Sequence, residues 1–202
     1  DISNTNFYSA LLSDINFSTI KNKSLENSII DLAGFAWSDF RGVKLPKEFS
    51  MSNFFNANME GIDLRDRSIH GTTFYSTKLS GASFNNSDMS GIYKKYVLND
   101  VPNFSEETLK GMITELPVIQ LTNDIVTNGK DVEVVVLLFN NFYDANIENG
   151  SFVSTNLSWS EFSYANLRGV DFTNAELSNS YIVKADLTGA NLTGANLTGA
   201  NL

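Results

Sequence analysis

The feature that most constrains this chain is a large apolar residue at every fifth position over its last third. A period of five belongs neither to an α-helix, which repeats every 3.6 residues, nor to a flat strand, which alternates every two. Two residues before each centre the side chain is usually small, and the residue between them is usually polar, as in Ala185-Asp186-Leu187. The chain is therefore a repeat protein. The unbroken series of centres is Phe142, Ile147, Phe152, Leu157, Phe162, Leu167, Phe172, Leu177, Ile182, Leu187, Leu192, Leu197 and Leu202.

Elementary geometry converts this repeat into a fold. In extended chain alternate side chains share a face, so the small and the large residue both point inward and the polar residue between them points outward. Because five is odd, an unbroken strand would reverse this pattern in the next repeat, and the chain must turn once per repeat. Turns of one hand wind the chain into coils that pair at about 4.8 Å, with the large side chains in an internal column. Each buried Leu or Phe contributes roughly 1.5 to 3 kcal/mol, so the repeat predicts an all-β solenoid.

The sequence Ala185-Asp186-Leu187-Thr188-Gly189 and its near-copies resemble the pentapeptide-repeat family, whose consensus is A(D/N)LXX. The resemblance implies a right-handed quadrilateral β-helix with four pentapeptides per coil. It is closest in residues 140–202, which we expect to form the regular part of the solenoid.

Residues 1–91 match the repeat more loosely, and we expect them to form an irregular part of the same solenoid. The register slips near Ile20 and near Pro46, and we interpret each slip as a loop or bulge inserted at a corner. Three of the small inward positions hold large residues, which are Lys23, Ile62 and Arg67. The centres fall into three registers: Phe7, Leu12 and Phe17; then Leu25, Ile30, Phe35, Phe40 and Leu45; then Phe54, Met59, Leu64, Ile69, Phe74, Leu79, Phe84 and Met89.

Residues 92–139 interrupt the repeat and predict a small α-containing insert. Ser105 followed by Glu106 and Glu107 is typical of a helix start, and Pro117 ends the apolar face that follows it. Asn128-Gly129 predicts a turn, and Val132 to Phe139 predicts a buried strand leading back into the solenoid. Two roles stay open for the insert. It packs against the solenoid and covers an apolar edge, or it protrudes and binds a partner.

Composition excludes several classes of function. The formal net charge is -9, with 23 acidic and 14 basic side chains, which disfavours direct binding of nucleic acid. The absence of cysteine excludes disulfides, thiolate zinc sites and cysteine nucleophiles. No apolar run is long enough to span a membrane. The single histidine, His70, is predicted to be an isolated outward side chain, so we expect no enzyme activity, no catalytic residues, no cofactor and no bound metal.

Outward aromatic residues are the candidate interaction site, because the repeat does not require them. With four repeats per coil, residues twenty apart share a column, which places Tyr164 between Asp144 and Lys184. Tyr and Trp are frequent in binding hot spots, which favours partner anchors. The alternative is that they are scattered surface rings or rings covered by the insert. The five candidates are Trp37, Tyr143, Trp159, Tyr164 and Tyr181.

Three functions follow from these patterns. The first is a non-catalytic protein-interaction scaffold. The second, which the resemblance suggests and the net acidity permits, is a DNA-mimicking inhibitor of a type II topoisomerase. Mimicry needs dense carboxylates along one face, whereas the column Asn146, Asn166 and Asp186 carries a single charge.

The third hypothesis is the repeat domain of a larger bacterial secreted effector. The sequence ends at Leu202 on a perfect repeat without a capping element, and exposed strand edges invite pairing. We therefore expect this coil to meet a protein partner, the rest of a larger chain, or a second copy in a homodimer. The compartment stays open between the cytoplasm and secretion into a host cell.

Overall fold

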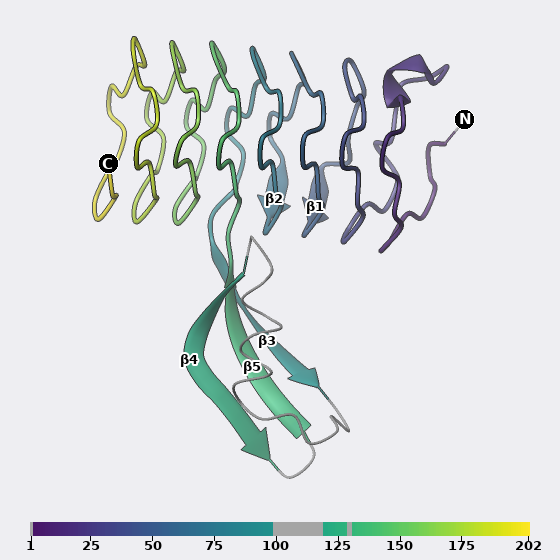
Figure 1. Cartoon of the computed structure of the whole chain (residues 1–202), viewed down its shortest axis with the longest axis vertical. Helices are drawn as coiled ribbons and strands as arrows, with labels where there is room; N and C mark the ends of the chain where they lie inside the picture. The colour runs from purple at the N-terminus through teal and green to yellow at the C-terminus, as the bar shows by residue number, and fades with distance from the viewer. Residues whose placement is uncertain (1, 99–118, 129–130) are drawn as a thin grey trace.

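Stacked coils form the body of the protein, and a separate sheet projects from one side of them (Figure 1). The computed structural model describes residues 2–98, 119–128 and 131–202. Parallel bridges join residues twenty apart, as from Asn146 to Asn166 and from Asn166 to Asp186, so four five-residue repeats make one coil. The predicted β-helix is confirmed. Within the described residues, no helix has the length and apolar character needed to cross a membrane.

Each corner of a coil is a tight turn that begins at an inward centre. In the turn that starts at Phe172, the N–H of Ala175 donates to the Phe172 carbonyl at 2.9 Å. The third residue of this turn, Asn174, has a φ of 56°, the sign that a type II turn requires and that Asn and Gly adopt most readily. The outward Asp171 accepts from the N–H of Thr173 at 2.9 Å, which ties the turn to the strand before it. These contacts explain why Asn, Thr and Gly are frequent in the two positions that follow each centre.

The core consists of columns of stacked rings inside the coils. Phe74 lies parallel to Phe142, with ring centroids 4.9 Å apart, and Phe142 lies parallel to Phe162 at 4.7 Å. A second column meets the first edge to face, as where Phe152 lies 5.8 Å from Phe142. Offset and edge-to-face contacts of this kind add to the free energy of burial. Because Phe74 and Phe142 flank the insert in sequence, the core continues across it without a break.

The first register slip is an insertion, as predicted. The 3-10 helix η1, Phe17–Thr19, occupies it. Asn16 pairs with Asp39, twenty-three residues on, whereas Ser24 pairs with Lys44 at the regular twenty. The chain between them thus carries three extra residues at the corner near Ile20.

The second slip is a shortening, and the prediction of inserted residues near Pro46 is wrong. Leu45 and Phe49 are both buried centres only four residues apart, so this corner uses one residue fewer than the others. Strand β1, Glu48–Ser50, follows it and pairs in parallel with β2, Ser68–His70. A count of five from Leu45 lands on Ser50 and passes over Phe49, whereas a count of five back from Phe54 would have reached it.

The insert forms a three-stranded antiparallel sheet in the order β3-β5-β4. Its strands are β3, Ile92–Leu98, β4, Ile119–Asn128, and β5, Asp131–Leu138. Strand β5 covers nearly the same residues as the predicted strand, while β3 and β4 had no clear pattern in the sequence. The strands extend away from the coils (Figure 1). The helix expected after Ser105 lies outside the described residues.

The end of β5 is clamped against one corner of the solenoid. Leu137 and Leu138 are buried there, beside Gly71 and Gly91. A Cβ added at Gly71 would lie 3.1 Å from the Cβ of Leu138, and one at Gly91 would lie 3.1 Å from Leu137 Cδ1. Each glycine therefore leaves the space that one leucine of the insert occupies.

Asn140 ties the returning chain to three backbone groups of the solenoid. Its Nδ2 donates to the carbonyls of Ile69 at 2.8 Å and Met89 at 2.7 Å, and its Oδ1 accepts from the N–H of Thr72 at 3.0 Å. The side chain is fully buried. It satisfies polar backbone groups where the insert interrupts the regular turn.

Candidate interaction surface

Five aromatic rings form a row along the outside of the solenoid. Neighbouring ring centroids are 5.1, 5.4, 5.1 and 5.1 Å apart, so the row is continuous. It crosses the point of insertion, because Tyr75 lies against Tyr143. We name this row the aromatic ladder, and its members are Trp37, Phe55, Tyr75, Tyr143 and Tyr164.

Two positions of the turn supply the ladder. Phe55, Tyr75 and Tyr143 directly follow an inward centre, whereas Trp37 and Tyr164 come one residue later. Trp37 has a φ of 58° and Tyr164 a φ of 62°. Bulky residues rarely occupy this left-handed region, and Asn or Gly would fit it with less strain. The repeat alone therefore does not account for aromatic residues at these corners.

The three middle rings of the ladder are half-buried, and the rings at its two ends are exposed. Tyr75 and Tyr143 are nearly parallel, with 13° between their planes, so each ring covers a face of the other. Trp37 is 55% exposed and stands at the end of the row, at 87° to Phe55. A partner can therefore reach the Trp37 ring most readily.

A lysine closes the opposite end of the ladder. The Nζ of Lys184 lies 5.1 Å from the centroid of the Tyr164 ring and donates to the Tyr164 hydroxyl at 3.1 Å. This is a cation–π contact reinforced by a hydrogen bond. It confirms the predicted alignment of Tyr164 with Lys184 and shows that a basic side chain fits this surface.

Negative groups accompany the rings. The pKa of the Tyr143 hydroxyl is raised, first by burial and then by Tyr164, Tyr75 and the carboxylates of Asp144 and Glu161. Asp144 also accepts from the Ser76 hydroxyl at 2.8 Å. The middle of the ladder is therefore electronegative, and Tyr143 stays protonated at neutral pH.

The structure brings three of the five candidate residues together and leaves two outside. Trp37, Tyr143 and Tyr164 belong to the ladder. Trp159 packs at the base of the insert, where a Cβ added at Gly91 would lie 2.8 Å from the Cβ of Trp159. Tyr181 is 41% exposed, and its backbone forms parallel β-bridges with Glu161 and Asn201 in the neighbouring coils.

Phe55 and Tyr75 are ladder residues that the sequence analysis missed. They lie twenty apart, which places them in one column, but the insert separates Tyr75 from Tyr143 by sixty-eight residues. Removing the insert from the count before aligning the repeats would have revealed the row.

Sequence comparison places the chain in a family. Residues 52–91 match the family model of pentapeptide repeats in eight copies, and residues 133–202 match that of a pentapeptide repeat region. The two stretches together span more than half of the chain. The chain belongs to the pentapeptide-repeat family. Its coils are those of a right-handed β-helix, as the resemblance implied.

Solved structures of other pentapeptide-repeat proteins are similar to this chain at low identity. A thylakoid-lumen protein of Arabidopsis thaliana is 19% identical with a TM-score of 0.45, over 71% of this chain and 66% of that one, just under two thirds of its length. HetL of the cyanobacterium Nostoc sp. strain PCC 7120, involved in heterocyst differentiation regulation, is 18% identical with a TM-score of 0.30, over 99% and 84%. QnrB1, a plasmid-mediated fluoroquinolone resistance protein, is 15% identical with a TM-score of 0.32, over 98% and 84%. No curated protein matches the sequence.

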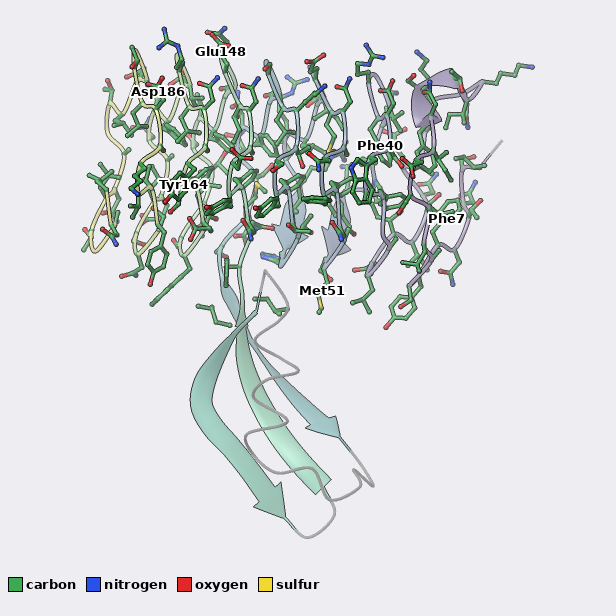
Figure 2. The ribbon with its side chains drawn as sticks, viewed as in Figure 1. Phe7, Phe40, Met51, Glu148, Tyr164 and Asp186 are labelled. Carbon is green, nitrogen blue, oxygen red and sulfur yellow. The ribbon has the colours of Figure 1, made fainter. Side chains whose placement is uncertain are left out.

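Carboxylates of this pentapeptide-repeat protein are spread over its surface rather than concentrated in one row. The predicted column of Asn146, Asn166 and Asp186 is confirmed by their bridges, and Arg168 lies 3.3 Å from Asp186. On the first half, Asp63 is paired with Arg65 at 2.7 Å, and this hydrogen bond is the main reason why the pKa of Asp63 falls to about 2. Figure 2 shows Glu148 and Asp186 at the edge of the solenoid away from the projecting sheet, whereas Met51 lies on the side of the sheet.

His70 is not the isolated surface group that the sequence predicted. It is half-buried in β2, where its Nε2 lies 3.0 Å from the Ser68 hydroxyl and its Nδ1 lies 3.0 Å from the Ser90 carbonyl. Ser68 and the histidine share a face because they are two residues apart on a strand. Over the part of the chain that the structure describes, no three His, Cys, Asp or Glu side chains gather as metal ligands would.

Proposed function

We propose that this pentapeptide-repeat protein is a non-catalytic protein-interaction module that binds its partner along the aromatic ladder. The observation that supports this most is the continuity of the row from Trp37 to Tyr164 across the insert. Rigid aromatic side chains give a large contact area at a low cost in conformational entropy, which is why Tyr and Trp are frequent in hot spots. The solenoid holds these rings in place before a partner arrives.

A basic segment is the partner chemistry that the ladder favours. Lys184 already packs on Tyr164 in the way that a partner's lysine or arginine would pack on Trp37. Asp144 and Glu161 lie near the middle of the row, and the whole chain has a net charge of -9. Complementary charge would speed association and select against acidic partners. The segment belongs either to a separate protein or to a further part of a longer effector chain.

Inhibition of a type II topoisomerase by DNA mimicry is the second candidate, because the net charge of -9 favours it. The paired carboxylates disfavour it, since Asp39 and Asp63 each have an arginine partner at 2.7 Å. A gyrase supercoiling assay separates the two candidates. Inhibition at stoichiometric protein, retained after Trp37→Ala, would support mimicry and contradict binding through the ladder.

Binding of labelled peptides tests the proposed function. Fluorescence anisotropy is measured with arginine-rich peptides and with glutamate-rich peptides of equal length. We expect only the basic set to bind, and expect Trp37→Ala to weaken that binding about tenfold or more, the loss typical of a hot spot. Tyr181→Ala is the matched control, because Tyr181 is exposed outside the ladder. Equal loss in both variants, or binding by the acidic set, would contradict the proposal.

A further inference from the structure

Arg67 is a large charged residue at a position where most repeats carry a small inward residue. It lies two residues before the buried centre Ile69, where most regular repeats carry Ala, Ser, Gly or Thr. The N–H of Ser68 donates to the carbonyl of Lys47 at 2.9 Å, so the corner next to Arg67 in the preceding coil is the shortened one that follows Pro46. An arginine at such a site needs a reason outside the repeat.

A cavity of about 380 Å³ lies beside this side chain. Gly42 and Gly61 form part of its wall, and the Gly61 turn has nothing within 4 Å of where a Cβ would be. Ligand pockets are usually about 300 to 1,000 Å³, so this one suits a small molecule rather than a protein segment. The full lining is Glu26, Gly42, Val43, Lys44, Gly61, Ile62, Asp63 and Arg67.

The guanidinium of Arg67 is not fully satisfied by hydrogen bonds. Its Nε is buried and has no hydrogen-bond partner among the described residues. Burial lowers the pKa of Arg67, although Asp63, Glu26 and Asp66 oppose that change from a distance. A buried donor left without an acceptor costs about 1 to 3 kcal/mol, and more when the group is charged. The unpartnered Nε of Arg67 therefore lowers the stability of the fold.

The carboxylates of the cavity are already engaged by other basic groups. Arg65 holds Asp63 at 2.7 Å, and Lys44 lies 3.9 Å from Glu26. Lys23 adds a further positive charge at the rim, since its Nζ would be 3.9 Å from a Cβ at Gly42. Four basic side chains, Lys23, Lys44, Arg65 and Arg67, therefore surround the two lining carboxylates of Glu26 and Asp63.

We propose that this cavity binds a small phosphate-bearing molecule through the guanidinium of Arg67. Guanidinium donors match the oxygens of a phosphate in a forked geometry, and Arg67 lines the cavity where such a group would bind. Lys44 and Lys23 would add charge for a dianionic group. The site is separate from the aromatic ladder, so its occupancy and the binding of a protein partner can be tested independently.

Thermal unfolding and calorimetry with inorganic phosphate test the proposal. Phosphate is compared with chloride and with acetate at equal ionic strength and pH, on the full chain. We expect phosphate to raise Tm and to give a saturable heat of binding, because a ligand that binds only the folded state stabilises it. Acetate is expected to be about tenfold weaker or more, since it offers a single charge.

Arg67→Ala is the decisive variant. It restores the residue type that the repeat prefers, so we expect it to fold with a Tm at or above that of the original chain and to lose the response to phosphate. Arg168→Ala removes one exposed arginine from the regular half and should respond as the original does. An unchanged phosphate response in Arg67→Ala, equal effects of phosphate and chloride, or acetate binding as strong as phosphate binding would each overturn the proposal.

Discussion

The two halves of the solenoid have one fold but use it differently. In residues 140–202 every bridge follows the twenty-residue spacing, and outward side chains bond to their copies in the next coil, as Asn166 does with Asn146 at 3.1 Å. In residues 2–91 the coils are lengthened by η1 and shortened at Pro46, and arginines bond to carboxylates two residues earlier. The cavity with Arg67 and the Trp37 end of the ladder both lie in this irregular half. Where local sequence departs from the repeat, a structural or functional reason is to be expected.

The largest expected effect is on the core where the halves meet. Phe142 is fully buried between Phe74 and Phe162, so Phe142→Ala should lower the free energy of unfolding by roughly 3 to 5 kcal/mol. Leu192→Ala, at a partly exposed centre of the regular half, should cost less than about 2 kcal/mol. Urea unfolding followed by circular dichroism measures both. Equal losses would show that the two halves do not share a core.

Asn140 gives the second-largest effect, because its side chain has no substitute in the regular repeat. Asn140→Ala leaves the carbonyls of Ile69 and Met89 and the N–H of Thr72 without this partner, and should cost about 3 kcal/mol. Asn166→Ala is the control and should cost about 1 kcal/mol or less, since its partner at Asn146 is only part-buried. The same unfolding measurement applies, and a cost at Asn140 no greater than that at Asn166 would contradict the anchoring role.

Alanine substitutions at two glycines distinguish the free-energy cost of backbone strain from the cost of displacing the insert. Gly71 and Gly81 have φ values of 57° and 68°, so an alanine at either costs about 1 kcal/mol in strain. Only at Gly71 would the new Cβ also meet Leu138, at 3.1 Å. We expect Gly71→Ala to lower stability by about 1 kcal/mol more than Gly81→Ala. Equal costs would mean that the insert is not clamped at this corner.

The smallest effect is electrostatic and depends on pH. The pKa of Asp63 is lowered to about 2 from the usual 3.8 of an aspartate, so its ion pair stabilises the fold above pH 3.8 and loses that contribution as the pH falls towards 2. Both side chains of the pair are 57% exposed, which limits the contribution to less than about 1 kcal/mol. Asp63→Asn should therefore unfold more easily than the original at neutral pH and equally easily near pH 2. A difference that grows on acidification would have the wrong sign.

The solenoid could be predicted from the sequence because the residues that set its five-residue period are the large apolar residues of the core. The sequence analysis did not extend the third register back five residues from Phe54 to Phe49, and it therefore misread the corner at Pro46 as longer when it is shorter. Strands β3 and β4 were not predicted because their residues follow neither the five-residue repeat nor a strict alternation of apolar and polar side chains. Within the ladder, Trp37, Tyr143 and Tyr164 were predictable as outward rings. They join Phe55 and Tyr75 in one row only because the coil before the insert stacks directly on the coil after it. No local sequence pattern reveals that stacking.

The central claim is that the coils stack directly across the insert, and a disulfide tests it in a chain that has no cysteine. Lys78 and Asn146 are bridge partners on adjacent coils, whereas Lys78 and Asn166 are two coils apart. The double variant Lys78→Cys with Asn146→Cys should form an intramolecular disulfide on mild oxidation, because adjacent strands bring the Cα atoms within the roughly 4.4 to 6.8 Å that a disulfide spans. The variant Lys78→Cys with Asn166→Cys should stay reduced. Peptide mapping that found no link from 78 to 146, or equal links in both variants, would contradict a continuous solenoid.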